Sequence, residues 1–164
     1  MAQLWVNLPA AHKLTTPKYQ PILKSAIPVV DLLEGSGKAR IIAGNLDGVA
    51  GAASTFTNIN MWDVELLSGK SFDFTIPEGD NTLIFVRTGS AKLFGDKVLN
   101  AEKVVVLSQK GSRIHIEAES QSNCCLLILS GTPINEPIAA RGPFVMNTEA
   151  ELRQAMKEYQ TGVF

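Results

Sequence analysis

Apolar and polar residues alternate with a period of two along much of the chain. In the segment FDFTIPEGDN, Phe72, Phe74 and Ile76 alternate with Asp73 and Thr75. Successive side chains of a β-strand point to opposite faces of a sheet, so this pattern predicts a strand with one buried and one solvated face. The Pro, Gly, Asp and Asn residues that follow predict the turn that ends the strand.

Similar runs, rich in β-branched and aromatic residues, recur between turn-forming residues. The predicted strands, about ten in number, cover residues 4–9, 29–33, 39–43, 59–67, 72–76, 82–89, 90–96, 103–108, 113–120 and 123–131. The glycines of EGSGK predict a β-hairpin between the second and third of these runs. The unbroken apolar run at 124–129 predicts a strand buried on both faces. The whole pattern is typical of an antiparallel sandwich or a small barrel.

The C-terminal segment changes to a helical pattern. Thr148 and Glu151 have the spacing of a capping box, and Gly162 can supply the left-handed residue that ends a helix. The apolar residues that fall on one stripe of this helix are Leu152, Ala155, Met156 and Tyr159. Such a stripe predicts packing against an apolar surface rather than a cofactor site.

The length of 164 residues fits one domain with a single core. We expect an all-β fold with one short C-terminal α-helix. Within it, residues 1–28 are an N-terminal strand and a proline-interrupted surface segment, residues 29–131 form the β-sandwich, and residues 132–164 form a C-terminal segment that contains the helix.

Charge and cysteine content narrow the choice of partners and compartment. The formal net charge is −1 without long blocks of one sign, which gives no electrostatic reason to expect nucleic acid or an anionic membrane. No apolar run approaches the ~20 residues that span a bilayer, and the first residues lack a secretory-signal pattern. Cys124 and Cys125 are adjacent, so we expect two reduced thiols on opposite faces of one strand. These features predict a cytoplasmic protein.

Few residues are candidates for catalysis or metal binding. The chain has only two histidines, His12 and His115, and no HxH, HxxH or HExxH spacing that would gather the ligands of a metal site. Strand alternation places His115 on a solvated face and His12 lies in the surface segment, so a solvated role is favoured over a polar site for both. Asp63 and Glu65 would share a strand face without an evident basic partner. We expect no catalytic residue, metal ligand or cofactor in this chain.

Four aromatic residues, Trp62, Phe72, Phe74 and Phe85, fall within the predicted strands. Aromatic side chains at such positions usually fill a core. The alternative is that they line a small-ligand pocket in the interior of the sandwich.

Two longer segments carry a resemblance to a known family. QLWVNLPAAHKLTTPKYQ at residues 3–20 and GTPINEPIAARGPFVMNTEAELRQAMKEYQTGVF at residues 131–164 resemble the pirin family. The resemblance implies the second half of a two-domain cupin, an antiparallel β-sandwich of the jelly-roll (double-stranded β-helix) type, with the terminal segment packed over the sandwich. It places the family's iron site, three histidines and a glutamate, in the N-terminal cupin, whose HxHRG-type motif has no counterpart here.

The resemblance also implies several functions. We expect a metal-free, non-catalytic module for protein association or scaffolding, present as a homodimer or paired with a separate N-terminal pirin half. Regulatory partners are implied as well, which are transcription coregulators in eukaryotes and metabolic enzymes in bacteria. The alternatives are one half of a split pirin-type quercetin 2,3-dioxygenase that needs a separate metal-bearing chain, and a small-ligand binder.

Overall fold

The computed structural model of the chain describes residues 3–95 and 97–163, and its residues group into two compact units. Unit 1 combines the residues up to Lys18 with those from Ile134 onward, and unit 2 comprises Tyr19–Pro133. Among the described residues, no helix is both long and apolar enough to cross a bilayer.

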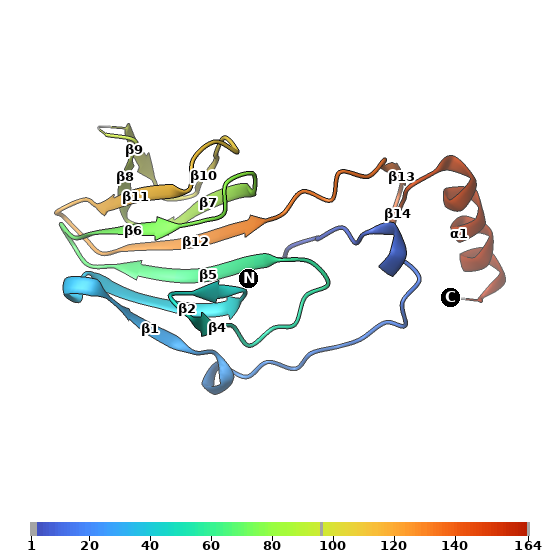
Figure 1. Ribbon diagram of the computed structural model, residues 1–164, viewed down its shortest axis with the longest axis horizontal. Coiled ribbons are helices and arrows are strands. Elements are labelled where there is room, and N and C mark those ends of the chain that lie inside the picture. Colours follow the sequence, from blue (N-terminus) through green and yellow to red (C-terminus); the bar gives the residue numbers. More distant parts are fainter. Residues whose placement is uncertain (1–2, 96, 164) are drawn as a thin grey trace. The chain divides into compact units, whose positions relative to one another are not determined.

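Unit 2 is a sandwich of two antiparallel sheets (Figure 1). The strands of the larger sheet are, in spatial order, β1 (Val29–Leu32), β2 (Gly37–Ala43), β5 (Ile59–Leu66), β12 (Cys124–Gly131), β7 (Asn81–Thr88) and β10 (Lys103–Val106). Those of the smaller sheet are β6 (Ser71–Thr75), β11 (Arg113–Ala118), β8 (Ser90–Leu93) and β9 (Lys97–Asn100). The expected hairpin is confirmed, since β1 pairs antiparallel with β2 across a short 3-10 helix, Leu33–Gly35.

Shorter elements complete the described chain. A second short hairpin in unit 2, β3 (Asn45–Leu46) with β4 (Val49–Ala50), lies between the predicted strands at 39–43 and 59–67. The remaining 3-10 helices are Ala10–His12 in unit 1 and Lys24–Ala26 in unit 2. Unit 1 contains the hairpin β13 (Ala139–Arg141) with β14 (Phe144–Met146) and the helix α1 (Glu149–Thr161).

The core of the sandwich is built from the residues that alternation points inward. Trp62 of β5 and Phe74 of β6 belong to different sheets and stack with ring centroids 6.0 Å apart. Phe72 packs edge-on against Phe74 at 4.7 Å. Both Trp62 and Phe74 are fully buried, so the aromatic contact joins the two sheets at the centre of the core.

A single glycine carries the chain from one sheet to the other. Gly89 is the residue between β7 and β8, which lie in different sheets, and it has a φ of 74°. A Cβ at this position would lie 2.4 Å from the carbonyl oxygen of Asn123. Any other residue would therefore combine a left-handed backbone with a collision against the neighbouring chain.

In unit 1 the helix begins at a complete capping box. The Glu151 amide donates to the Thr148 hydroxyl at 3.2 Å, and the Thr148 amide donates to Oε2 of Glu151 at 2.9 Å. The Thr148 hydroxyl and the amides of Asn147 and Thr148 hold the pKa of Glu151 below its ordinary value of 4.5. Gly162, with a φ of 71°, ends the helix in the left-handed conformation. Leu152 and Ala155 are buried where the helix contacts β13 and β14.

Two expectations for unit 1 need correction. Residues 3–9 do not form the expected strand, because no described strand pairs with them and Pro9 lacks an amide hydrogen to extend a ladder. Tyr159 is not buried with the rest of the stripe, since it is 65% exposed, and its ring lies edge-on to that of Phe144. Met156 is half-buried. The apolar stripe is therefore buried in the first half of the helix and becomes exposed toward its C-terminal end.

Truncating the buried side chain of Leu152 tests this packing. We expect Leu152→Ala to lower the free energy of unfolding of unit 1 by about 2–5 kcal/mol, because it leaves a cavity beneath the helix. The helical circular-dichroism signal during urea unfolding measures it, since α1 is the α-helix of the described residues. Arg153→Ala, on the exposed side of the same turn, should change stability by less than about 0.5 kcal/mol. Equal effects of both variants would show that the stripe is not packed.

Candidate functional site

The outer face of the larger sheet, opposite the core, carries a strip of apolar side chains. The strip, called the outer strip below, consists of Leu83 and Phe85 on β7, Val104 and Val106 on β10, and Leu127 and Leu129 on β12. Val104 is 55% exposed and Val106 is 70% exposed, whereas Leu127, near the middle of the sheet, is only 6% exposed. Contiguous apolar patches on a protein surface commonly mark sites of association.

The pairing register brings these residues together in two rows. Leu127 lies opposite Phe85, which lies opposite Val104, and the next row joins Leu129, Leu83 and Val106 in the same way. Directly paired residues in a sheet have neighbouring side chains, so each row forms a continuous apolar line across three strands. Sequence alternation alone could not align these rows, because the strands are far apart in the chain.

A charged cluster continues the first row toward β2. Arg40 donates from Nε and Nη2 to Oδ2 of Asp63, at 3.0 and 2.5 Å, and Nη2 of Arg87 donates to Oδ1 of the same carboxylate. The Asp63 side chain is only 16% exposed. Two guanidinium groups share one carboxylate, which leaves the cluster with a positive charge and with donors directed elsewhere.

A register shift between β7 and β12 makes this cluster possible. Cys125 pairs with Thr88 but Leu126 pairs with Val86, so Arg87 is the additional residue at the irregularity. Such bulges re-aim a side chain, and Arg87 reaches across β12 to Asp63 on β5. The basic partners of Asp63 are not evident from the sequence, because Arg40 and Arg87 come from two other strands.

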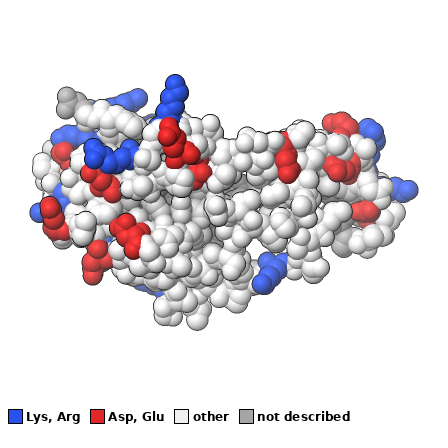
Figure 2. All heavy atoms as spheres, viewed as in Figure 1, with Lys and Arg blue, Asp and Glu red and all other residues white. Residues whose placement is uncertain are grey.

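The outer face of the smaller sheet is polar instead. Lys92 contacts Glu117 at 3.1 Å and Glu119 at 3.4 Å, and these two carboxylates raise the pKa of Lys92. Nδ1 of His115 lies 2.8 Å from Oδ1 of Asp73. Over the face drawn in Figure 2, acidic and basic residues are intermingled without a field of one sign. The two faces of the sandwich therefore differ in character, and only that of the larger sheet is suited to apolar contact.

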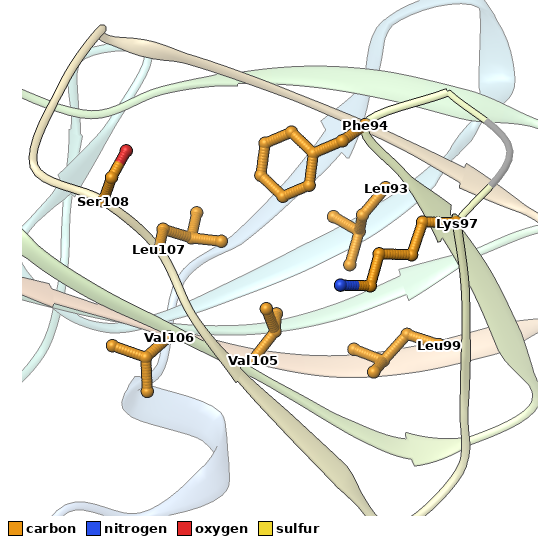
Figure 3. A pocket seen from close by; sticks show the side chains of 8 residues that line it. All are labelled: Leu93, Phe94, Lys97, Leu99, Val105, Val106, Leu107 and Ser108. Carbon is orange, nitrogen blue, oxygen red and sulfur yellow. The ribbon is translucent and has the colours of Figure 1, made fainter.

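A cavity of about 260 Å³ opens where the two sheets part at their edges. Its walls come from β8, β9 and β10 and from the turns next to them, and include Leu93, Leu99, Val105 and Leu107 (Figure 3). Phe94 and Lys97, on either side of the β8–β9 turn, lie over the opening. We call this space the mouth cavity.

The structure disperses the four aromatic residues that the sequence had grouped. Trp62 and Phe74 fill the core, Phe72 packs half-buried beside them, and none of the four lines the mouth cavity. Phe85 belongs to the outer strip, because its neighbours Ile84 and Val86 occupy the inward positions of β7. Placing Phe85 in the interior was therefore wrong. Alternation along β7 is the sequence signal that places Phe85 on the outer face, unlike the other three aromatic residues.

The described residues do not form the donor set of an iron site. His12 lies in unit 1 and His115 in unit 2, and no three His, Cys, Asp or Glu side chains of the described chain converge as metal ligands would. The indole Nε1 of Trp62 is buried and makes no hydrogen bond to another described residue, but a single N–H donor cannot ligate a metal. No metal-dependent step is derived from these residues.

Comparison with known proteins identifies the family. The model of the pirin C-terminal cupin domain matches residues 61–164. This chain belongs to the pirin family.

Individual pirin relatives match nearly the whole chain. A Pseudomonas aeruginosa protein, provisionally named as a quercetin 2,3-dioxygenase, is 37% identical over 100% of this chain and 56% of its own length. Pirin-1 of Arabidopsis thaliana is 33% identical over 96% of this chain and 55% of its own length. The crystal structure of a quercetin 2,3-dioxygenase from Acinetobacter baumannii shares 39% identity over 98% of this chain and 55% of that protein, with a TM-score of 0.90.

These matches confirm the expected cupin-like fold. A second Acinetobacter baumannii structure, at 21% identity and a TM-score of 0.80, shares the fold as well. The chain spans about half the length of these relatives. The sandwich of this pirin chain therefore corresponds to the C-terminal cupin domain of these relatives. The remaining residues of the relatives lie outside the matched region.

The two cysteines provide a chemical test of the strand faces. Burial, and to a lesser extent the adjacent thiol, raises the pKa of Cys124 to about 11, whereas Cys125 is half-buried on the outer face. Because the thiolate is the reactive form, iodoacetamide should modify Cys125 in the native protein and Cys124 only after unfolding. Mass spectrometry of labelled peptides measures this, with Cys125→Ser as the control that should take up no label while folded. Rapid native labelling of Cys124 would contradict the assignment of faces.

Proposed function

We propose that this pirin domain is a non-catalytic association module that packs its outer strip against the metal-bearing cupin half of a pirin. The observation that carries the proposal is the apolar character of β12 on both faces. Cys124, Leu126 and Ile128 enter the core, and Leu127 and Leu129 point to the opposite side. Within unit 2, the smaller sheet covers only the first of these faces.

The charged cluster beside the strip supports a particular kind of partner surface. Both oxygens of Asp63 accept hydrogen bonds from Arg40 and Arg87, so the remaining guanidinium N–H groups can donate to a further carboxylate. A partner that meets this face needs apolar side chains opposite the outer strip and an acidic side chain opposite the arginines. Such complementarity fixes the register of docking more than it adds affinity.

The length of the relatives supports the identity of the partner. This chain accounts for 55% of the Acinetobacter baumannii dioxygenase, so nearly half of that protein consists of other residues. A cupin half of that size is large enough to cover a sheet face of standard interface area. The proposal places the association in the cytoplasm, and the two free thiols of the chain agree with a reducing compartment.

A split dioxygenase is the second candidate, and it rests on the names of the relatives. In that case the complex with a metal-bearing half would consume quercetin, while this chain alone would not. The two candidates share the same interface and differ only in the activity of the complex. An assay for quercetin loss, with each half alone and with both together, distinguishes them.

A charge introduced into the outer strip tests the interface. We expect Val104→Asp to weaken binding to the unmatched half of the Acinetobacter baumannii dioxygenase, produced as a separate protein, by at least about tenfold, because it desolvates a carboxylate against apolar side chains. Isothermal titration calorimetry measures the affinity. Val98→Asp is the matched control, since Val98 is 43% exposed on β9 of the smaller sheet and should leave binding unchanged.

Labelling of Cys125 provides an independent footprint of the same surface. Cys125 lies on the outer face of β12, so its reaction with iodoacetamide should slow when the partner is bound. Sedimentation of the chain alone tests the other possible partner of the outer strip, which is a second copy of this chain. A dimer that Val104→Asp dissociates would assign the strip to self-association instead. Binding that neither variant alters would contradict the proposed surface.

A further inference from the structure

The mouth cavity has the size and lining of a binding site for a small apolar molecule. Its volume of about 260 Å³ lies just below the range of about 300–1,000 Å³ that is usual for ligand pockets. A buried cavity of about 150 Å³ is enough for benzene, so this one accommodates two fused rings. The walls are mainly side chains of leucine, valine and phenylalanine, and Lys97 and Ser108 are the polar residues of the lining.

The position of the cavity explains why it exists. β9 and β10 are the edge strands of the smaller and the larger sheet, and the two sheets are not closed against each other along these edges. Leu99, Val105 and Leu107 pack on the core from one side and are only partly buried. The core therefore ends in an open apolar recess instead of a closed wall.

Phe94 holds an unfavourable conformation above this recess. Its φ is 55°, and among the described non-glycine residues with a left-handed φ it is the only apolar one, the others being Glu34, Asp47, Glu102 and Asn135. Left-handed backbone is costly for a bulky side chain. The ring is also 64% exposed to solvent, although it lies over the cavity across from Leu107 (Figure 3). A ligand in the cavity would cover the ring. Its binding would offset the cost of the exposed ring and that of the left-handed backbone.

Lys97 supplies the polar group of the site. Its side chain extends across the cavity with the ammonium toward Val105 (Figure 3). Among the residues that the structure describes, none forms a hydrogen bond or ion pair with this ammonium. Lys92 on the neighbouring strand, by contrast, contacts two glutamates. Within the described chain this cation has no counterion, and a cation at the rim of an apolar cavity favours a ligand that ends in an anionic group.

We propose that the mouth cavity binds a small aromatic carboxylate of about two fused rings. The rings lie between Phe94 and the leucine side chains, and the carboxylate pairs with the Lys97 ammonium. Of the lining residues, Val106 also belongs to the outer strip, but the ligand site does not depend on the association proposed above. It gives the sandwich a ligand-binding role that uses none of the four aromatic residues considered from the sequence.

Titration with 2-naphthoate, followed by amide NMR shifts of the full chain, tests the proposal. We expect saturable shifts confined to β8, β9, β10 and their turns, with a dissociation constant below about 1 mM. The neutral analogue 2-naphthalenemethanol should bind about tenfold more weakly, because it cannot pair with the ammonium. Decanoate distinguishes an aromatic site from one for aliphatic chains, and should bind more weakly than 2-naphthoate.

Two variants separate the roles of the ring and the charge. Lys97→Met should weaken 2-naphthoate about tenfold while leaving 2-naphthalenemethanol unchanged. Phe94→Asn should weaken both ligands and raise the melting temperature, since asparagine tolerates the left-handed backbone. Lys70→Met, an exposed lysine outside the cavity, is the control and should change neither affinity. Equal affinity for acid and alcohol, shifts elsewhere in the chain, or no saturable binding would overturn the proposal.

Discussion

The central strand β12 is apolar on both of its faces, and this constraint shapes the rest of the sandwich. Leu126 and Ile128 belong to the core that Trp62 and Phe74 join across the two sheets. Leu127 and Leu129 point the other way and build the outer strip with side chains of β7 and β10. A strand at the edge of the sheet could leave one face to solvent, but a central apolar strand requires a cover on both. The association proposed for this pirin domain follows from that requirement.

The charged groups of the sandwich also differ between the outer faces of the two sheets. On the outer face of the smaller sheet the charged side chains pair with one another, Lys92 with two glutamates and His115 with Asp73. The larger sheet concentrates its charge on Asp63, whose carboxylate is shared by two arginines beside the apolar rows. Exposed ion pairs such as those of the smaller sheet add little to stability. Their effect is that the charges on the outer face of the smaller sheet are already paired, whereas the outer face of the larger sheet is suited to a complementary surface.

The mouth cavity and the outer strip meet at β10, the edge strand of the larger sheet. The strip depends on rows of paired residues within the larger sheet, whereas the cavity depends on the gap that the two sheets leave between β9 and β10. An open sandwich of this kind ends its core either in solvated side chains or in a recess. Here Phe94 and Lys97 border a recess, so ligand binding uses a surface that shares only Val106 with the outer strip.

By itself, the sequence determined the local features whose causes lie within a few residues. Alternation around Phe72 and Phe74, the turn in EGSGK, and the capping box of Thr148 and Glu151 all depend on short-range geometry, and each appears where the pattern indicated. The motifs at both ends also led to the pirin family. Only the tertiary structure decided which strands are neighbours. That choice brings Arg40 and Arg87 to Asp63, aligns Phe85 with Leu127 and Val104 in one row and opens the cavity beneath Phe94, because contacts between distant segments depend on register and sheet order, which no local periodicity encodes.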